Sequence, residues 1–135
     1  MEQTDRNKEV VRNFIRAVLQ ELDPTAVDDL VADDFVSHTW RIPGDAKAGL
    51  KGMAQKMGAT LSDVTFQVDD LIAEDDKVVA RVTSSATPIA DFQGIKPTGR
   101  GYSVGEIHIF RVRDGRIAEH WHEYDAAGIV KQLKG

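Results

Sequence analysis

The chain has 135 residues, of which 41% are hydrophobic and 29% are charged, and its formal net charge at pH 7 is -5. These values are typical of a globular protein, and the length suits one domain over residues 1–135 rather than two independent cores. The net negative charge argues against a nucleic-acid-binding protein, and the absence of cysteine excludes disulfides, thiolate catalysis and cysteine-ligated zinc.

The first residues bear on the location of the protein. Segment 1–11 is charged and lacks the apolar stretch and small-residue cleavage site of a secretory signal. No segment approaches the roughly 20 apolar residues that span a bilayer. We therefore expect a cytoplasmic protein whose partner is a small molecule or a protein, and neither nucleic acid nor a membrane.

Three helices are expected in the first half of the chain. Apolar residues recur at helical spacing from Lys8 to Leu22, which predicts an amphipathic helix. Asp23-Pro24 suits the start of a short second helix. Alternating residues at 34–40 are typical of a short strand, and a third helix is expected over 46–61, although its glycines lower helix propensity.

The second half is typical of a β-sheet. Apolar residues alternate at 64–68, β-branched residues are frequent over 78–90, and strands are expected over 101–113 and 116–124. Helices followed by a run of strands predict an α+β fold. We expect the N-terminal helices to pack on the concave face of a curved, mainly antiparallel sheet.

The last hairpin carries three of the four histidines, so its register decides whether they meet. A two-residue loop, Asp114-Gly115, would pair His108 with Trp121. In that register His122 would lie on the opposite face of the sheet, because side chains alternate along a strand. The histidines would then be scattered.

A three-residue loop, Arg113 to Gly115, is the alternative. It would pair Glu106 with His122 and His108 with His120. Turn propensity does not decide between the two loops. We favour the three-residue loop because it gathers the polar residues on one face, and a slip of one residue would reverse this conclusion.

In that register, ionisable groups share one sheet face with aromatic and apolar residues. A carboxylate beside an imidazole fixes its tautomer and raises its basicity, as a general base requires. Burial of such groups without a use is costly, so the pattern predicts a functional pocket. The expected catalytic residues are Glu106, His108 and His122, and the expected substrate-binding residues are His38, Trp40, Tyr102, Phe110, His120 and Tyr124.

Three segments, taken in chain order, resemble the SnoaL-like polyketide cyclases. Residues 34–38 resemble the early D-[FY]-V-x-H motif of that family, residues 92–100 its G-[IM]-P-P-T-[GD]-R loop, and residues 115–133 its C-terminal signature. The resemblance implies a cone-shaped α+β barrel of the nuclear transport factor 2-like type, shared with ketosteroid isomerases. In such barrels helices close a deep apolar cavity.

The resemblance also implies a reaction. Characterised members close a ring of a polyketide ester by intramolecular aldol condensation without a metal or organic cofactor, using an aspartate as general acid/base and an assisting histidine. His108 matches the family histidine, whereas the aspartate position holds His122. Because a protonated imidazole is cationic and a protonated carboxyl is neutral, this change predicts a different charge distribution around an enolate.

Three functions remain open at this point. The first is a cofactor-independent lyase or isomerase acting on a small hydrophobic carbonyl compound, with His122 as base, His108 polarising the carbonyl and Glu106 orienting His122. The second is a histidine-ligated metal protein, because His120 joins these residues in a set of imidazole and carboxylate ligands. The third is a non-catalytic module that binds a small molecule.

The opposite sheet face predicts a partner. It is expected to carry Ile107, Ile109, Ile117 and Trp121, which together form an apolar patch. A patch of this kind is often covered by another subunit. We therefore expect a homodimer.

Overall fold

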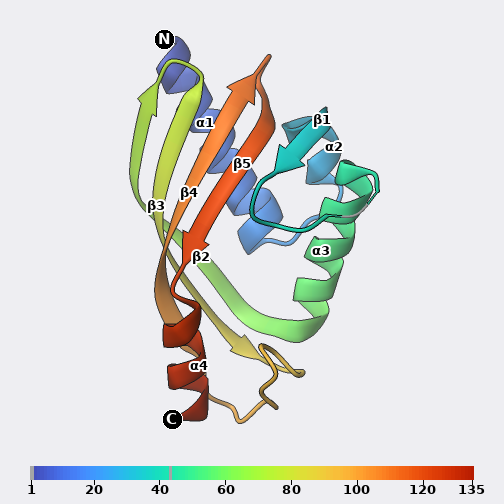
Figure 1. Ribbon diagram of the computed structural model, residues 1–135, viewed down its shortest axis with the longest axis vertical. Coiled ribbons are helices and arrows are strands. Elements are labelled where there is room, and N and C mark those ends of the chain that lie inside the picture. Colours follow the sequence, from blue (N-terminus) through green and yellow to red (C-terminus); the bar gives the residue numbers. More distant parts are fainter. Residues whose placement is uncertain (1, 43) are drawn as a thin grey trace.

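The computed structural model describes residues 2–42 and 44–135, and Figure 1 shows helices on one side of a curved sheet. The sheet has five strands in the order β1-β5-β4-β3-β2, with β1 parallel to β5 and the other pairs antiparallel. The predicted α+β class is confirmed. The sheet is open, because its edge strands β1 and β2 do not pair with each other within the described ranges. No helix in those ranges is long and apolar enough to cross a membrane.

The N-terminal helix runs behind the sheet in Figure 1. Helix α1 spans Gln3–Phe14 and continues as the π-helix η1, Ile15–Gln20. It therefore begins before Lys8 and ends before Leu22, whose φ of 54° takes the chain out of the helix. At that end, Gln20 Oε1 accepts a hydrogen bond of 2.8 Å from the backbone N–H of Phe66, which ties the helix to β2.

The next segment places the chain at the sheet edge. Helix α2 spans Ala26–Leu30, and β1 spans Val31–Ser37, earlier than the predicted strand over 34–40. The strand ends where Ser37 Oγ accepts hydrogen bonds from the backbone N–H groups of Thr39 and Trp40, at 3.3 and 2.9 Å. These bonds turn the chain, so the predicted alternation does not continue to Trp40.

The remaining elements follow the predicted order. Helix α3 is capped by the Asp45 side chain, which accepts from the N–H of Ala48 at 2.9 Å. The C-terminal helix is capped by Asp125, which accepts from the N–H of Gly128 at 2.8 Å. The elements are α3 Ala46–Thr60, β2 Leu61–Glu74, β3 Lys77–Pro88, β4 Tyr102–Arg113, β5 Arg116–Tyr124 and α4 Ala126–Lys134.

The hydrophobic core lies between α1, η1 and the concave face of the sheet. Phe14 on α1 packs edge-on against Phe110 on β4, with ring centroids 5.4 Å apart. Val11, Val18 and Leu50 are fully buried beside them. Burial of these side chains is the main source of stability and fixes the helices over the sheet.

The loop of the last hairpin differs from the predicted one. Asp114 and Gly115 have φ angles of 52° and 73°, the pattern of a two-residue type I′ turn. This turn pairs Arg113 with Arg116. The predicted three-residue loop is therefore wrong.

A β-bulge in β5 brings the three histidines back to one face of the sheet. The register of β4 and β5 shifts by one residue between Arg111 and Val112, which leaves Ala118 as an extra residue on β5. Beyond the bulge His108 faces His122, and His120 faces a phenylalanine rather than His108. The predicted partners were wrong, but the three histidines still point to the same side of the sheet.

Because of the bulge, the apolar patch on the uncovered sheet face also differs from the prediction. Ile117 is fully buried in the core, because the two residues at the bulge both turn inward. Ile107 is 40% exposed, and Ile109 and Trp121 are half-buried on the uncovered face. The apolar outer patch is therefore smaller than predicted.

Candidate active site

A cavity of about 290 Å³ is lined by the helices and the concave side of the sheet. Most of its lining is apolar, and this part comes from η1, α3, β2 and α4 together with loop residues such as Leu22 and Phe92. The last two strands contribute Glu106 and His108 from β4 and His122 from β5. The predicted residues Trp40, Tyr102 and Tyr124 also line it.

Glu106 is the centre of the polar group. Its Oε1 accepts hydrogen bonds from Nε2 of His108 at 2.9 Å and Nε2 of His122 at 2.8 Å, and its Oε2 accepts from the Ser84 hydroxyl. Burial by itself raises the pKa of Glu106, but these three hydrogen bonds lower it to about 2. Glu106 is therefore a carboxylate at neutral pH.

A chain of hydrogen bonds leads away from Glu106 into the core. His108 Nδ1 lies 2.9 Å from Nε2 of His120, and His120 Nδ1 lies 3.1 Å from the Ser37 hydroxyl. Burial lowers the pKa of His108. It also lowers the pKa of His120 to about 2, with a further contribution from the neighbouring imidazoles. Both rings are therefore neutral at neutral pH.

One assignment of hydrogens satisfies these contacts. An ionised carboxylate only accepts, so His108 and His122 both donate to it through Nε2–H. His108 Nδ1 is then an acceptor for Nε2–H of His120, whose own Nδ1 accepts from the Ser37 hydroxyl. A neutral His122 carries its remaining lone pair on Nδ1. That nitrogen is the one buried side-chain polar atom among the described residues that has no hydrogen-bond partner.

Aromatic contacts hold the rings in place. The Trp40 ring stacks on His120, with centroids 3.9 Å apart. His122 stacks on His108 at 4.0 Å and on Tyr124 at 5.0 Å. The orientation of the unpartnered nitrogen is therefore set by packing as well as by its hydrogen bond to Glu106.

Tyr102 provides a hydroxyl at the same cavity. Its ring stacks on Phe92 with centroids 5.8 Å apart. Burial, together with the nearby charge of Glu106, raises the pKa of Tyr102 to about 12. The phenol therefore keeps its proton and can donate a hydrogen bond to a ligand.

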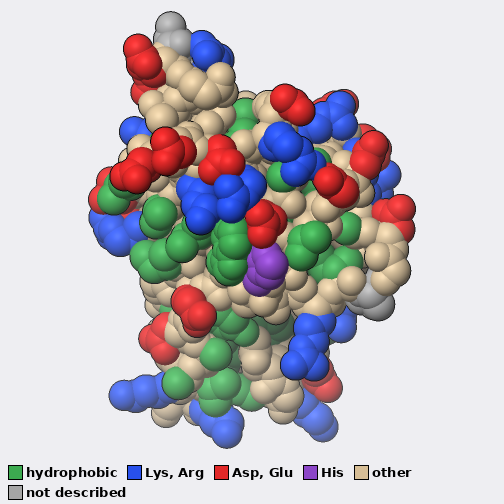
Figure 2. All heavy atoms as spheres, turned by 45° about the horizontal axis from the view of Figure 1, so that its top comes forward, with side chains coloured by type: hydrophobic (Ala, Val, Ile, Leu, Met, Phe, Trp, Pro, Cys, Tyr) green, Lys and Arg blue, Asp and Glu red, His purple; other side chains and the backbone are tan. Residues whose placement is uncertain are grey.

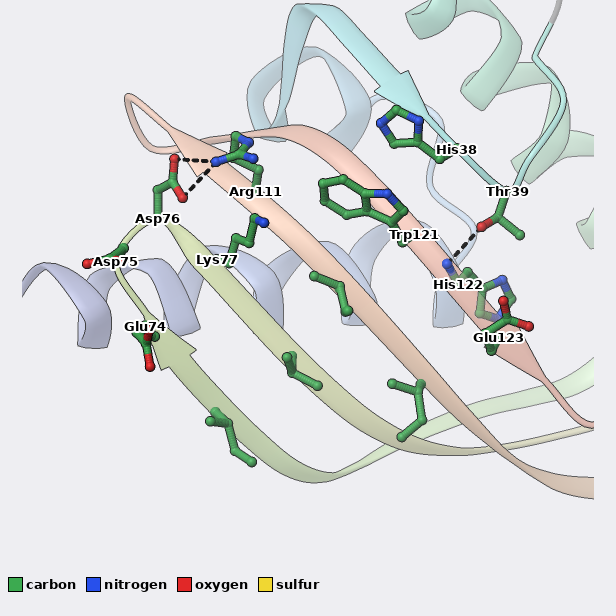
Figure 3. Close-up of a pocket in the computed structure, with 14 residues that line it drawn as sticks. His38, Thr39, Glu74, Asp75, Asp76, Lys77, Arg111, Trp121, His122 and Glu123 are labelled. Atoms are coloured by element: carbon green, nitrogen blue, oxygen red, sulfur yellow. Dashed lines mark hydrogen bonds and ion pairs between the residues drawn. The ribbon is translucent and has the colours of Figure 1, made fainter.

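Three of the predicted substrate-binding residues lie outside the cavity lining. His38 is on the uncovered sheet face beside Trp121 (Figure 3), and it stacks on that ring. Its Nε2 lies 2.7 Å from Glu119 Oε2. It was misplaced because the chain turns after Ser37. Phe110 and His120 are fully buried in the core behind the cavity.

The chain is similar along most of its length to a known protein family. The model of the SnoaL-like polyketide cyclase family matches residues 9–133. The chain belongs to this family. A search of curated protein sequences found no significant match.

Solved structures agree with the SnoaL-like assignment. TsrD from Streptomyces laurentii is 30% identical, with a TM-score of 0.87 over 98% of each chain. IdmH from Streptomyces antibioticus, provisionally described as a polyketide cyclase, is 28% identical with a TM-score of 0.81 over 96% of this chain and 99% of IdmH. A protein from Acidithiobacillus ferrooxidans with the same provisional description is 25% identical, with a TM-score of 0.84 over 99% and 98% of the two chains.

Sequence reasoning missed two residues of this SnoaL-like site. Ser84 donates to Glu106, and Ser37 contacts His120. A serine on a strand gives no chemical signal by itself. The two-residue period of β3 offered one clue, because Ser84 has the same parity as the apolar Val82, which the structure shows to be buried.

The three buried histidines also have the composition of a metal site. Ring nitrogens of His108, His120 and His122 lie within 4.8 Å of one another, and imidazole suits zinc, copper or iron. An ion bound by all three would have to displace the hydrogen between His108 and His120. Both ring nitrogens of His108 and of His120 are already hydrogen-bonded, so the arrangement favours acid/base chemistry over metal binding.

Proposed function

We propose that this SnoaL-like protein is a cofactor-independent acid/base enzyme that removes a proton next to the carbonyl of a small, neutral, hydrophobic compound. The observation that carries the proposal is the unpartnered Nδ1 of His122, backed by a buried carboxylate in a mostly apolar cavity. A lone pair placed in this way is what a general base requires.

The proton would move from the substrate carbon to Nδ1 of His122. The imidazolium that forms is stabilised by the Glu106 carboxylate, 2.8 Å from Nε2. Glu106 is itself a poor base, because its oxygens already accept three hydrogen bonds. The electron pair left by the proton forms an enolate, and the Tyr102 hydroxyl is the candidate donor to its oxygen.

His108 takes a different role from the one that the sequence suggested. Both of its ring nitrogens are occupied, one by Glu106 and the other by His120. It would have to break one of these bonds to polarise a carbonyl. We assign it instead to holding Glu106 and stacking on His122.

Two reactions follow from the same enolate. Attack of its carbon on a second carbonyl of the substrate closes a ring, and the alkoxide formed from that carbonyl takes the proton back from His122, as in an aldol cyclisation. Return of the proton at another carbon gives an isomerisation. The description of IdmH as a polyketide cyclase supports the first, an ester cyclase or lyase type of reaction.

The charge of the cavity favours an uncharged substrate. No lysine or arginine belongs to its described lining, and Glu106 places a negative charge beside it. An anion would therefore lose hydration without gaining a cationic partner. A ketone or an ester fits this environment better than a free carboxylate.

The proposed function can be tested with 1-tetralone, a neutral bicyclic ketone. We expect the wild-type protein to exchange the hydrogens next to its carbonyl for deuterium in D2O, with saturation, as followed by mass spectrometry. His122→Ala is expected to lower this rate by about 10²- to 10⁴-fold, because the base is lost. His38→Gln, a histidine variant outside the cavity, is the matched control and should keep the wild-type rate.

Other outcomes of that experiment favour the alternatives. Binding of the ketone is followed by Trp40 fluorescence in a Trp121→Phe protein, which leaves one tryptophan at the cavity. Binding without exchange would support a non-catalytic binding module. Exchange that is lost on chelation and restored by zinc or iron would support the metal protein.

We also propose that the protein is cytoplasmic and that its uncovered sheet face forms a homodimer. Figure 2 shows hydrophobic side chains on this face below a cluster of acidic and basic residues. Ile72 and Ile107 are 60% and 40% exposed there, in a groove that includes Trp121. Ile107→Glu is expected to convert the dimer to a monomer in analytical ultracentrifugation. A wild-type monomer at micromolar concentration would refute the proposal.

A further inference from the structure

Two polar residues of the site, the buried His120 and the half-buried Ser37, have no part in the proton transfer itself. His120 is fully buried and does not line the cavity, yet both of its ring nitrogens are paired. Ser37 holds one end of this pairing. Burial of an imidazole is costly, so a completely paired ring behind an active site calls for a reason.

We propose that Ser37 and His120 are positioning residues that fix the tautomer of His108 and thereby keep the Glu106 carboxylate directed at His122. This inference rests on the proposed role of His122 as base. It adds that the lone pair on His122 Nδ1 depends on a hydrogen-bond direction set at the end of β1.

The direction of the hydrogen-bond chain is set first by backbone N–H groups that bond Ser37. Ser37 Oγ accepts the N–H groups of Thr39 at 3.3 Å and Trp40 at 2.9 Å. A hydroxyl has two lone pairs and one hydrogen. Because both lone pairs are occupied, the hydrogen is left for the nitrogen 3.1 Å away, Nδ1 of His120. His120 must then carry its own hydrogen on Nε2.

The same donor-to-acceptor direction continues through the imidazole rings of His120 and His108. Nε2–H of His120 donates to Nδ1 of His108, so the hydrogen of His108 lies on Nε2 and points at Glu106 Oε1. In the other tautomer, a lone pair of His108 would face the carboxylate. That contact is repulsive and would disturb the oxygen that also holds His122.

The same turn fixes the backbone of the base. Thr39 Oγ1 accepts the N–H of His122 at 2.8 Å, as Figure 3 shows. Trp40, the next residue, stacks on His120. Residues 37–40 therefore contact both ends of the hydrogen-bond chain, which explains how one short turn sets the geometry of the whole site.

The inference is tested by ¹⁵N NMR on protein labelled in its histidines, at neutral pH. In the wild type, we expect His108, His120 and His122 each to be protonated at Nε2 and unprotonated at Nδ1. Ser37→Ala is expected to give mixed tautomers at His120 and His108. Ser37→Thr keeps the hydroxyl and should restore the wild-type spectrum.

The activity readout separates positioning from folding. Ser37→Ala is expected to lower kcat for deuterium exchange into 1-tetralone by about tenfold with KM unchanged, the effect of one lost hydrogen bond. Ser85→Ala is the matched control, because the Ser85 hydroxyl bonds Ser103 and not the histidines. It should leave the spectrum and the rate unchanged.

The possible failures are distinguishable. A Ser37→Ala spectrum identical to that of the wild type, or a wild-type His120 protonated at Nδ1, would overturn the positioning role whatever the activity. The expected tautomers in a protein without any exchange activity would support the hydrogen-bond direction. The missing exchange activity would count against the proposed role of His122 as base.

Discussion

Replacement of Glu106 by leucine is expected to lower the free energy of unfolding by about 3 kcal/mol or more. The carboxylate accepts from three buried donors, on His108, His122 and Ser84. Each buried donor left without a partner costs about 1 to 3 kcal/mol. A loss of this size is a large share of the roughly 5 to 15 kcal/mol that stabilises a domain. Urea denaturation followed by circular dichroism measures it.

Glu106→Gln removes the negative charge of the side chain while keeping its size and shape. The amide keeps one acceptor oxygen, so this variant is expected to fold. It loses the negative charge that stabilises the His122 imidazolium, and we expect deuterium exchange to fall by about 10²- to 10⁴-fold.

Glu9→Gln is the control for that change of charge, since Glu9 is exposed on α1. It should match the wild type in stability and rate. A Glu106→Gln protein with wild-type exchange would show that the carboxylate has no role in the reaction. A Glu106→Leu protein as stable as the wild type would show that the three donors find other partners.

Acidification is expected to destabilise the protein through its buried histidines. The pKa of His120 is about 2 in the folded chain, against an ordinary value of 6.5, so between these values the unfolded chain binds a proton that the folded chain excludes. Stability is therefore complete above pH 6.5 and falls as the pH drops below it. From pH 7 to pH 5 the loss through His120 is about 2 kcal/mol.

His108 and Glu106 act in the same direction. Burial lowers the pKa of His108 as well, so it adds to the loss below pH 6.5. The pKa of Glu106 is about 2 in the folded chain against 4.5, so its contribution disappears as the pH falls from 4.5 towards 2. Urea denaturation at pH 7, 6 and 5 measures the slope, and His120→Gln should reduce it by about one proton. An unfolding free energy that is constant or rises between pH 7 and 5 would contradict the neutral, buried state of these rings.

The sequence was informative where a residue pattern has one structural solution. Helical spacing located the N-terminal helix, and the two-residue period placed Glu106, His108 and Phe110 on one face of β4. The predicted loop of the last hairpin was wrong, yet the face was right. A three-residue loop would remove Arg113 from β4, whereas the bulge at Ala118 adds a residue to β5. The two shift the register by one residue in opposite directions, so they give the same parity, and parity alone decides which side of the sheet a histidine takes.

Other features depend on contacts that no local pattern reveals. His38 shares the parity of Trp40 in the sequence, but the turn after Ser37 separates the two residues onto different sides of the sheet. That turn is held by a serine hydroxyl, and Ser84 supports Glu106 from another strand. A small hydroxyl residue becomes recognisable as part of a site only when its partner across the fold is known.

The resemblance placed an aspartate of the family at the position of His122. In this chain the carboxylate lies on β4 as Glu106, and the imidazole lies on β5 within 2.8 Å of it. The acidic group has therefore not been lost from the cavity. In the proposed reaction it holds the base, and the imidazole takes the proton.

Chemical rescue tests this central claim most directly. His122→Ala removes the ring at the cavity, and added imidazole is a small neutral base that can occupy the vacated space. We expect imidazole to restore deuterium exchange into 1-tetralone in His122→Ala with saturation, and not in Glu106→Gln, where the native ring still fills the site. No rescue, or an equal stimulation of wild type and both variants, would contradict the assignment of His122 as the base.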